Sequence, residues 1–222
     1  MRIKFFLHNI YIATILLIFY HHAISSNFND IVDRFQEKLE LSERTTAEEI
    51  IDAVGKITVE VQNNLSKIAS HRIDFSIKQK IIEQTVNYYF ESKYSTVQVT
   101  SLNSSIIRTY EVYIYLKHLA RLSQDRYQYV ELYFDEDFLR LGTIEKNYSS
   151  RYEREFEFDV SAYQIFKGGG GDDFYYTDVT LKVFNFIIFK KNEYWYLRLK
   201  SISAKDTYRL DEYIEDIRNR WK

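Results

Sequence analysis

The sequence contains no cysteine and no proline, and only six glycines among 222 residues. The missing cysteine excludes disulfides, thiolate metal sites, a cysteine nucleophile and a lipid-attachment cysteine behind a leader. Turns must be made by Gly, Asn, Asp and Ser, since proline is absent. Neither charge sign dominates, because 30 basic and 32 acidic residues are interleaved and give a net charge of -2. Nucleic acid is therefore not an expected partner.

Long apolar runs are scarce, and the one that matters lies near the amino terminus. Arg2 and Lys4 precede an apolar run from Ile10 to Tyr20, and the small residues Ala23 and Ser25 follow. This order is typical of a secretory leader, predicted over residues 1–25. The run is shorter than the roughly 20 residues that span a bilayer. We expect export to the periplasm or medium, without membrane attachment after cleavage; the alternative is a retained amino-terminal anchor.

Residues 27–70 are predicted to form a helical extension. Thr46 and Glu49 form a capping box for its second half. Apolar residues recur at spacings of three and four at Ile31, Phe35, Leu39, Ile50, Val54, Ile57, Val61, Leu65 and Ile68. Such a stripe serves either as a face docked on its own domain or as a coiled-coil arm for a protein partner or second copy.

Residues 76–208 are predicted to form the main α+β domain, in which the hydrophobic period changes from helical to alternating. Helices are expected from Ser76 to about Glu91 and from about Thr109. Strands are expected at 95–102, 126–134, 154–162, 174–190 and 194–200. Residues 209–222 predict an amphipathic carboxy-terminal helix, either packed on the sheet or detachable for a partner.

Four consecutive glycines, residues 168–171, stand between two predicted strands and are followed by Asp172 and Asp173. A phosphate-binding loop would need Lys and Ser or Thr there, followed by a helix. A calcium loop of the EF-hand type would need alternating acidic ligands and a terminal glutamate. We therefore interpret the glycine run as the flexible tip of a hairpin.

The sequence offers few parts for catalysis. Only His71 and His118 remain after removal of the leader, so neither a histidine-based triad nor a multi-histidine metal site is expected, and no cofactor is predicted. The acidic cluster 135–138 is interpreted as a solvated loop. Tyr176 and Asp178 share one face of a predicted strand, and burial there would raise the pKa of the aspartate. They and His118 are weak catalytic candidates.

Several segments within 76–207 carry a family resemblance. They read VQVTSLNSSIIRTYEVYIYLKHLARL, YQYVELYF, YEREFEFDVSAYQIFKG, YYTDVTLKV and YWYLRLKSISAKDT. These segments resemble an uncharacterised group of exported bacterial proteins with the nuclear transport factor 2-like fold. The resemblance implies helices packed in a strongly curved antiparallel sheet that forms a cone. The fold hosts enzymes, small-molecule binders and interaction modules alike, so it leaves function open.

The expected function is that of a non-catalytic module of the cell envelope that binds a protein partner or an apolar small molecule. A purely structural assembly protein is one alternative; a small isomerase or hydro-lyase with its site inside the cone is another. Partners or a second copy would bind through the 27–70 helices or the carboxy-terminal helix. The candidate ligand-binding residues are aromatic side chains on strand faces: Tyr129, Tyr133, Phe156, Phe158, Tyr163, Tyr176, Trp195 and Tyr196.

Overall fold

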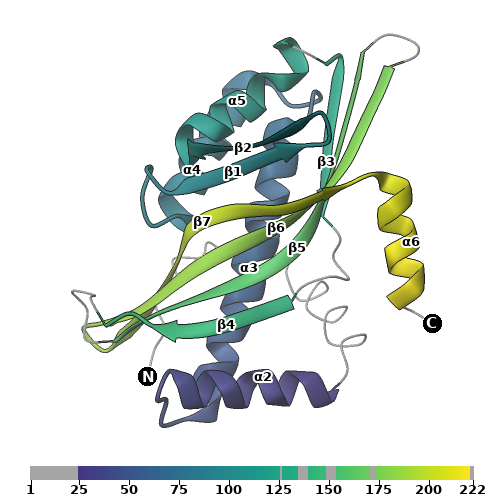
Figure 1. Ribbon diagram of the computed structural model, residues 1–222. Helices are drawn as coiled ribbons and strands as arrows, with labels where there is room; N and C mark the ends of the chain where they lie inside the picture. The colour runs from purple at the N-terminus through teal and green to yellow at the C-terminus, as the bar shows by residue number, and fades with distance from the viewer. Residues whose placement is uncertain (1–24, 126, 135–139, 149–153, 171–173, 221–222) are drawn as a thin grey trace.

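The computed structural model describes residues 25–220 except 126, 135–139, 149–153 and 171–173. Its architecture confirms the predicted α+β class, with helices packed into a strongly curved sheet (Figure 1). The predicted leader, apart from its last residue, and the acidic cluster at 135–138 lie outside the described residues. Among the described helices, none is both long and apolar enough to cross a membrane.

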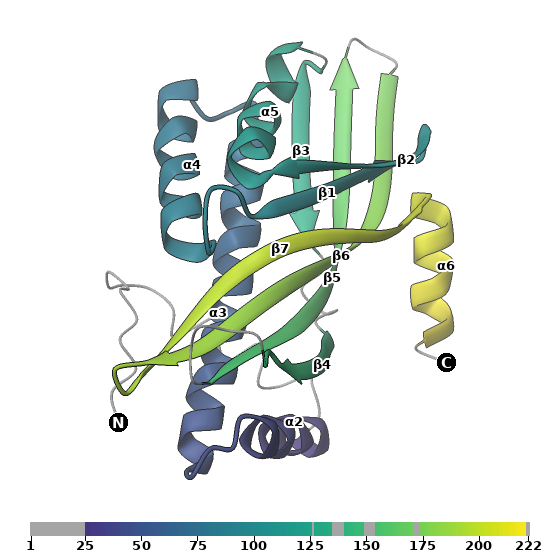
Figure 2. The ribbon, with the colours of Figure 1, turned by 60° about the vertical axis from the view of Figure 1, so that its left-hand side comes forward.

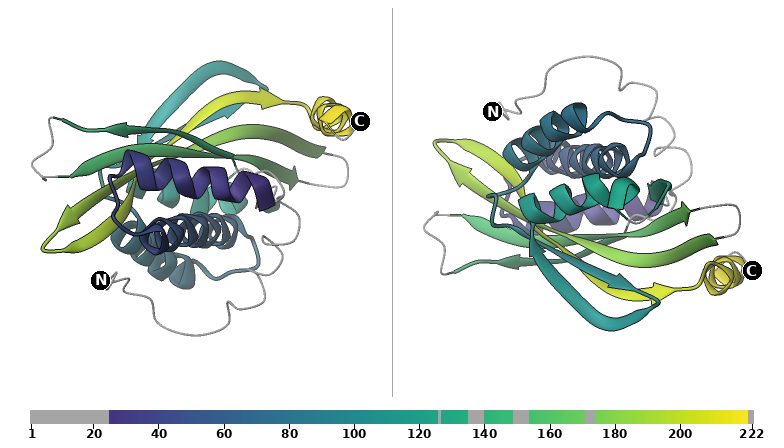
Figure 3. Two further views of the ribbon diagram at one scale, coloured as in Figure 1. Left: turned by 90° about the horizontal axis from the view of Figure 1, so that it is seen from below. Right: turned by 90° about the horizontal axis from the view of Figure 1, so that it is seen from above.

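Four helices cover one face of the sheet, and a fifth lies against the other (Figure 3). On the first face are α2 (Ser25–Lys38), α3 (Arg44–Ala69), α4 (Phe75–Tyr89) and α5 (Val112–Asp125). The carboxy-terminal helix α6 (Leu210–Arg220) packs on the opposite face, where Tyr213 contacts a small cluster around Tyr163 and Val179. Helices α2 to α5 therefore cover one face of the sheet, and α6 covers part of the other face.

The sheet has seven strands in the order β2-β1-β7-β6-β5-β3, and β4 also pairs with β5. The strands are β1 (Thr96–Ser101), β2 (Ser104–Glu111), β3 (Tyr129–Phe134), β4 (Arg140–Lys146), β5 (Glu155–Gly170), β6 (Phe174–Lys191) and β7 (Tyr194–Tyr208). All neighbours are antiparallel except β1 and β7, which are parallel. Strands β4 and β3 pair with the first and second halves of β5, so they follow one another along a single edge.

The curvature of the sheet has a local cause in β7. Thr180 and Lys182 of β6 pair with Thr207 and Ala204 of β7, so two steps along β6 correspond to three along β7. A second irregularity follows at Asn185. Extra residues in one strand bend it and increase its twist. The long strands accordingly bend across the helices instead of running straight (Figure 2).

The concave face and helices α2 to α5 share one hydrophobic core. Helix α3 buries a continuous stripe that includes Ile50, Ile57 and Leu65, and it packs against α4, α5 and β3. Phe158 stacks on Phe186 with ring centroids 5.4 Å apart, and Phe35 of α2 meets Phe158 edge-on. The apolar stripe of α3 is therefore covered by the chain's own domain.

The structure departs from the sequence pattern at three places. The segment from Thr109 was expected to begin a helix, but residues 104–111 form β2, and the helix begins at Val112. Strand β4 was not predicted. On α4 the apolar Ile77 is 49% exposed, while Lys78 is buried and donates a hydrogen bond from Nζ to the Ala120 carbonyl. A lysine whose aliphatic stem packs inward shifts the buried face away from the apparent apolar stripe.

The hairpin expected at the glycine run is confirmed, but three of its glycines lie in strand rather than turn. Gly168, Gly169 and Gly170 extend β5 and pair with the start of β6. A Cβ on Gly168 would lie 2.7 Å from the ring of Tyr127, and one on Gly169 would overlap the ring of Tyr129. The glycines therefore permit close approach of aromatic side chains to the backbone.

Candidate functional site

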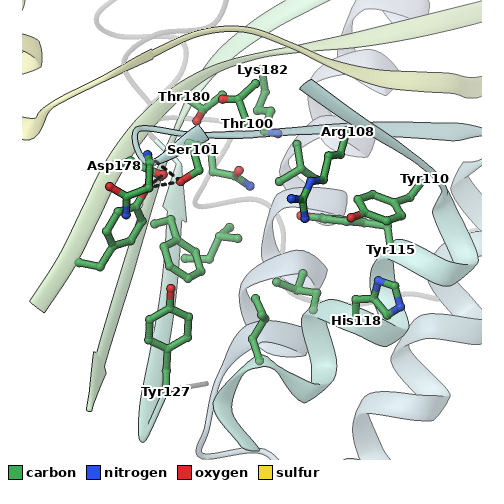
Figure 4. A pocket seen from close by; sticks show the side chains of 18 of the residues that line it. Thr100, Ser101, Arg108, Tyr110, Tyr115, His118, Tyr127, Asp178, Thr180 and Lys182 are labelled. Atoms are coloured by element: carbon green, nitrogen blue, oxygen red, sulfur yellow. Dashed lines mark hydrogen bonds between the residues drawn. The ribbon is translucent and has the colours of Figure 1, made fainter. Parts of the chain in front are cut away.

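A cavity of about 770 Å³ lies between the β1–β2 hairpin, α5 and the end of the sheet formed by β3, β5 and β6. It opens because β1 and β2 cross the top of the sheet and hold α5 away from β6 (Figures 2 and 4). Its lining changes from apolar aromatic walls to a polar base. This size falls within the range of about 300 to 1,000 Å³ found for small-molecule sites.

One side of the base is a chain of hydrogen bonds. The Tyr176 hydroxyl donates its one proton to Asp178 Oδ2 over 2.6 Å. In the 2.7 Å hydrogen bond between Ser101 and Tyr176, the Ser101 hydroxyl is therefore the donor and Tyr176 Oη is the acceptor. The Leu102 backbone N–H also donates to Tyr176 Oη over 3.2 Å. Tyr176 is thereby fixed in one orientation by the β1–β2 turn, and Figure 4 shows Asp178 and Ser101 together at this end.

Burial perturbs the ionisation of this cluster. Asp178 is buried on β6, and removal from water raises the pKa of its carboxyl, an effect partly offset by the Tyr176 hydrogen bond and by the charge of Lys182. Burial together with the hydrogen bond to Asp178 raises the pKa of Tyr176 to about 12. The pair thus holds a proton donor against a carboxyl that is easier to protonate than an exposed aspartate.

A buried amine stands further along the same strand. Lys182 is 2% exposed, and its Nζ donates to the Gln98 carbonyl over 2.7 Å. Burial lowers the pKa of Lys182 to about 8, although the charge of Asp178 opposes the shift. Among the described residues no carboxylate lies within 4.0 Å of this amine.

The walls are aromatic and the mouth is basic. Tyr110, Tyr115, Tyr127 and Phe166 supply the rings, and the Tyr115 hydroxyl has no hydrogen-bond partner among the described residues. Burial raises the pKa of Tyr115. At the mouth lie three exposed side chains from β2 and α5, namely Arg108, His118 and Arg121. Figure 4 places Arg108 and His118 on the side of the cavity opposite Asp178.

The structure brings Tyr176, Asp178 and His118 to this cavity and places the other predicted site residues elsewhere. Phe156, Phe158 and Trp195 belong to the main hydrophobic core, and Tyr163 packs under α6 on the opposite face. Tyr129 meets His71 edge-on, Tyr196 stacks on Phe189, and the exposed Tyr133 donates its hydroxyl to Glu131. His118 lies at the mouth with its ring edge-on to Tyr110.

Several lining residues were not identified from the sequence, among them Ser101, Arg108, Tyr115, Gln164, Thr180 and Lys182. One signal could have found some of them. On the inward face of β6, Tyr176, Asp178, Thr180 and Lys182 alternate with residues of the other face, and beyond them the same face continues as Phe184, Phe186 and Ile188. A change from polar to apolar along one buried face indicates where a core gives way to a polar cavity.

The described residues contain no group of three or more His, Cys, Asp or Glu side chains that could hold a metal ion. What they offer instead is hydrogen bonding and proton transfer. The arrangement can orient a small molecule between aromatic walls, accept a proton at Asp178 and donate one from Tyr176 or Lys182.

No protein-family model and no curated protein sequence matches the chain significantly. Among solved structures, a candidate scytalone dehydratase from Novosphingobium aromaticivorans aligns over 76% of this chain and 93% of its own, with 10% identity and a TM-score of 0.41. A type 2 hexachlorocyclohexane dehydrochlorinase (LinA) aligns over 71% and 89%, with 8% identity and a TM-score of 0.37. The Kfla4162 protein from Kribbella flavida aligns over 68% and 90%, with 11% identity and a TM-score of 0.35.

All three neighbours are members of the nuclear transport factor 2-like superfamily. Because their TM-scores lie below 0.5, they carry no argument about the chemistry of this chain. The fold class stands on the architecture itself: helices packed on the concave face of a seven-stranded curved sheet.

Proposed function

We propose that the protein is an exported, non-catalytic binding module of the bacterial cell envelope that holds a small molecule in the cavity above β6. The observation that carries this proposal is a cavity of about 770 Å³ whose aromatic walls end in buried polar groups. The Tyr115 hydroxyl and the Gln164 side-chain amide line this cavity and have no hydrogen-bond partner among the described residues, so both are available to a ligand.

Blocking the cavity tests the proposal. N-Phenyl-1-naphthylamine is a neutral aromatic dye that fluoresces in apolar sites, and we expect it to bind the wild-type chain. A Val99→Trp substitution places an indole in the cavity, while Thr109→Trp places the same group on the exposed face of the neighbouring strand. We expect V99W to weaken dye binding at least tenfold, about 1.4 kcal/mol, with T109W unchanged. Equal binding by all three proteins would refute the proposal.

A second candidate function is that of an isomerase or hydro-lyase, favoured by the buried Asp178 carboxyl and its contact with Tyr176. In this mechanism Asp178 takes a proton from the carbon next to a carbonyl group, and the Tyr176 hydroxyl turns from Asp178 to donate a hydrogen bond to the developing oxyanion. The C–O bond of the β-hydroxyl group then breaks, and the proton held by Asp178 leaves with that group as water. A screen of β-hydroxy carbonyl compounds would reveal dehydration by the ultraviolet absorbance of the conjugated product. Asp178→Asn should then retain binding and lose turnover; retained turnover would refute this candidate.

Localisation and assembly belong to the proposal as well. Cleavage near Ser25 would release the chain into the periplasm or medium, whereas a retained leader would anchor it; fractionation and amino-terminal sequencing distinguish the two. A protein partner or second copy would use the 27–70 helices or α6. The buried stripe of α3 favours a ligand over a partner as the principal occupant, since that helix face is already covered. Light scattering of the purified chain tests for self-association, and a monomer would restrict this part of the proposal to other proteins.

A further inference from the structure

The charges around the cavity are unequal. The lining residues that the structure describes include three basic side chains, Arg108, Arg121 and Lys182, together with His118, and one carboxyl, Asp178. The two arginines are exposed at the mouth, and Lys182 is buried at the base. The chain as a whole is mildly acidic, so this excess of positive charge is a local property of the cavity.

The amine of Lys182 has hydrogen-bonding capacity that the described residues do not use. An ammonium group carries three donors. The described residues provide one acceptor, the Gln98 carbonyl, and no carboxylate within 4.0 Å. Asp178 lies four residues away on the same face of β6, and its Oδ2 accepts the hydrogen bond from the Tyr176 hydroxyl. A buried charge without an ion-pair partner is costly unless something else neutralises it.

We propose that the cavity selects an organic anion: an aromatic or otherwise apolar molecule that carries one acidic group, seated with that group against Lys182 and its rings between Tyr115 and Phe166. An anionic oxygen would accept the unused ammonium donors, and such charge-assisted bonds are stronger than neutral ones. Arg108 and Arg121 at the mouth would attract the anion during association. The inference rests on the proposed binding function and adds the charge class of its ligand.

A matched pair of dyes tests the inference. 8-Anilino-1-naphthalenesulfonate and N-phenyl-1-naphthylamine share their aromatic rings, and only the first carries an acidic group. Both are titrated by fluorescence against the purified wild-type chain, Lys182→Met and a surface control, Lys205→Met. We expect K182M to weaken sulfonate binding by about tenfold or more, because the variant lacks the charged donor that bonds the acidic group. Binding of the neutral dye should change less than about twofold.

Two further measurements distinguish the contribution of Lys182 at the base of the cavity from that of Arg108 at its mouth. Raising the pH through about 8, where Lys182 loses its charge, should weaken the wild type for the sulfonate and leave K182M unaffected. Arg108→Gln should weaken sulfonate binding less than K182M and mainly at low ionic strength, because the guanidinium is exposed and its charge is screened by salt. K205M should match the wild type for both dyes.

The outcomes distinguish this inference from the function on which it rests. If the neutral dye binds in the cavity but K182M changes the two affinities equally, or changes neither, the cavity binds ligands without selecting anions and the inference is overturned. If V99W binds both dyes as tightly as the wild type does, the dyes do not occupy the cavity, and the binding function fails together with the inference. A loss specific to the sulfonate in K182M, absent from K205M, supports the proposal.

Discussion

Replacing Lys182 by methionine should stabilise the unliganded protein near neutral pH. Methionine has nearly the length and volume of lysine without its charge, so it can fill the same space below the cavity. The pKa of Lys182 falls from 10.5 to about 8 on folding, because the ammonium is buried. A shift of that size corresponds to about 3 kcal/mol of destabilisation when the group is charged. K182M also loses the hydrogen bond to the Gln98 carbonyl, which costs about 1 kcal/mol. The expected net increase in the free energy of unfolding of K182M is therefore about 2 kcal/mol.

The sign of the pH dependence follows from linkage. Between about pH 8 and the unfolded value of 10.5, the unfolded lysine keeps a proton that the folded lysine has released. The free energy of unfolding of the wild type therefore rises with pH between about pH 8 and 10.5. Below about pH 8 the folded lysine is charged, and the full cost of burying the ammonium applies. Methionine has no proton to release. The advantage of K182M over the wild type should thus be greatest near pH 7 and should shrink by about 3 kcal/mol towards pH 10.5.

Urea denaturation of wild type, K182M and K205M across this pH range measures the effect, since comparison of variants cancels the titration of all other groups. Lys205 is exposed on β7 and should give a constant difference from the wild type. A K182M advantage that does not vary with pH would show that Lys182 does not titrate as a buried amine. A variant less stable than the wild type at every pH would show that the amine is already neutralised within the fold.

Three further predictions concern other parts of the molecule. Tyr176→Phe removes the hydroxyl that donates to Asp178; we expect a loss of about 1 to 3 kcal/mol in unfolding free energy and a further rise in the pKa of Asp178, followed by carboxyl NMR. Gly169→Ala should lower the unfolding free energy by about 1 to 3 kcal/mol, because the added Cβ overlaps the ring of Tyr129. Gly170→Ala should cost less, since the nearest atom to its Cβ lies at 3.9 Å. Adding Tyr129→Ala should partly restore the stability of G169A. Tyr213→Ala should cost about 3 kcal/mol by unpacking α6 from Tyr163, whereas the exposed Ile214→Ala should cost little; equal costs within either matched pair would contradict the packing described.

The long strands and their inward faces could be predicted from the sequence because the pattern there is strong. On β5, Phe156, Phe158 and Val160 alternate with polar residues, and all three are buried. The glycine run likewise marked a hairpin. Its use for aromatic approach was not predictable, since Tyr127 and Tyr129 are about 40 residues distant in sequence and only pairing of β3 with β5 brings them onto the glycines.

The strand β2 was missed because its sequence carries two conflicting signals. Ile106 and Ile107 are adjacent rather than alternating, and both are exposed, at 64% and 49%, so no buried face with period two exists. Tyr110 and Tyr113 fit a helical spacing that continues into α5. Pairing with β1, in which Val97 lies opposite Tyr110, decides the outcome. Tertiary contacts override local pattern where an edge strand has no buried face of its own.

The candidate site was harder to predict than the fold for the same reason. The sequence identified Tyr176 and Asp178 because both lie on one strand. Only the folding of the β1–β2 hairpin over the sheet brings Ser101 to Tyr176 and Arg108 to the opposite side of the cavity. The aromatic residues chosen as ligand contacts were mostly core, because a strand pattern does not distinguish a ring packed against helices from a ring facing a cavity. That distinction depends on which helix covers each part of the sheet.

The placement of β1 and β2 explains why one end of the concave face became a cavity. At the lower end, α3 and α2 press directly on Phe158 and Phe186, and the sheet is sealed by close packing. At the upper end, β1 pairs with β7 in two parallel register positions, and Thr100 further along β1 still contacts Thr207 of β7. The inward positions of β6 there face β1 and the cavity: Tyr176 is hydrogen-bonded to Ser101, and Lys182 donates to the Gln98 carbonyl. Apolar residues there would face an open space, and the polar series that occupies them instead can serve a ligand.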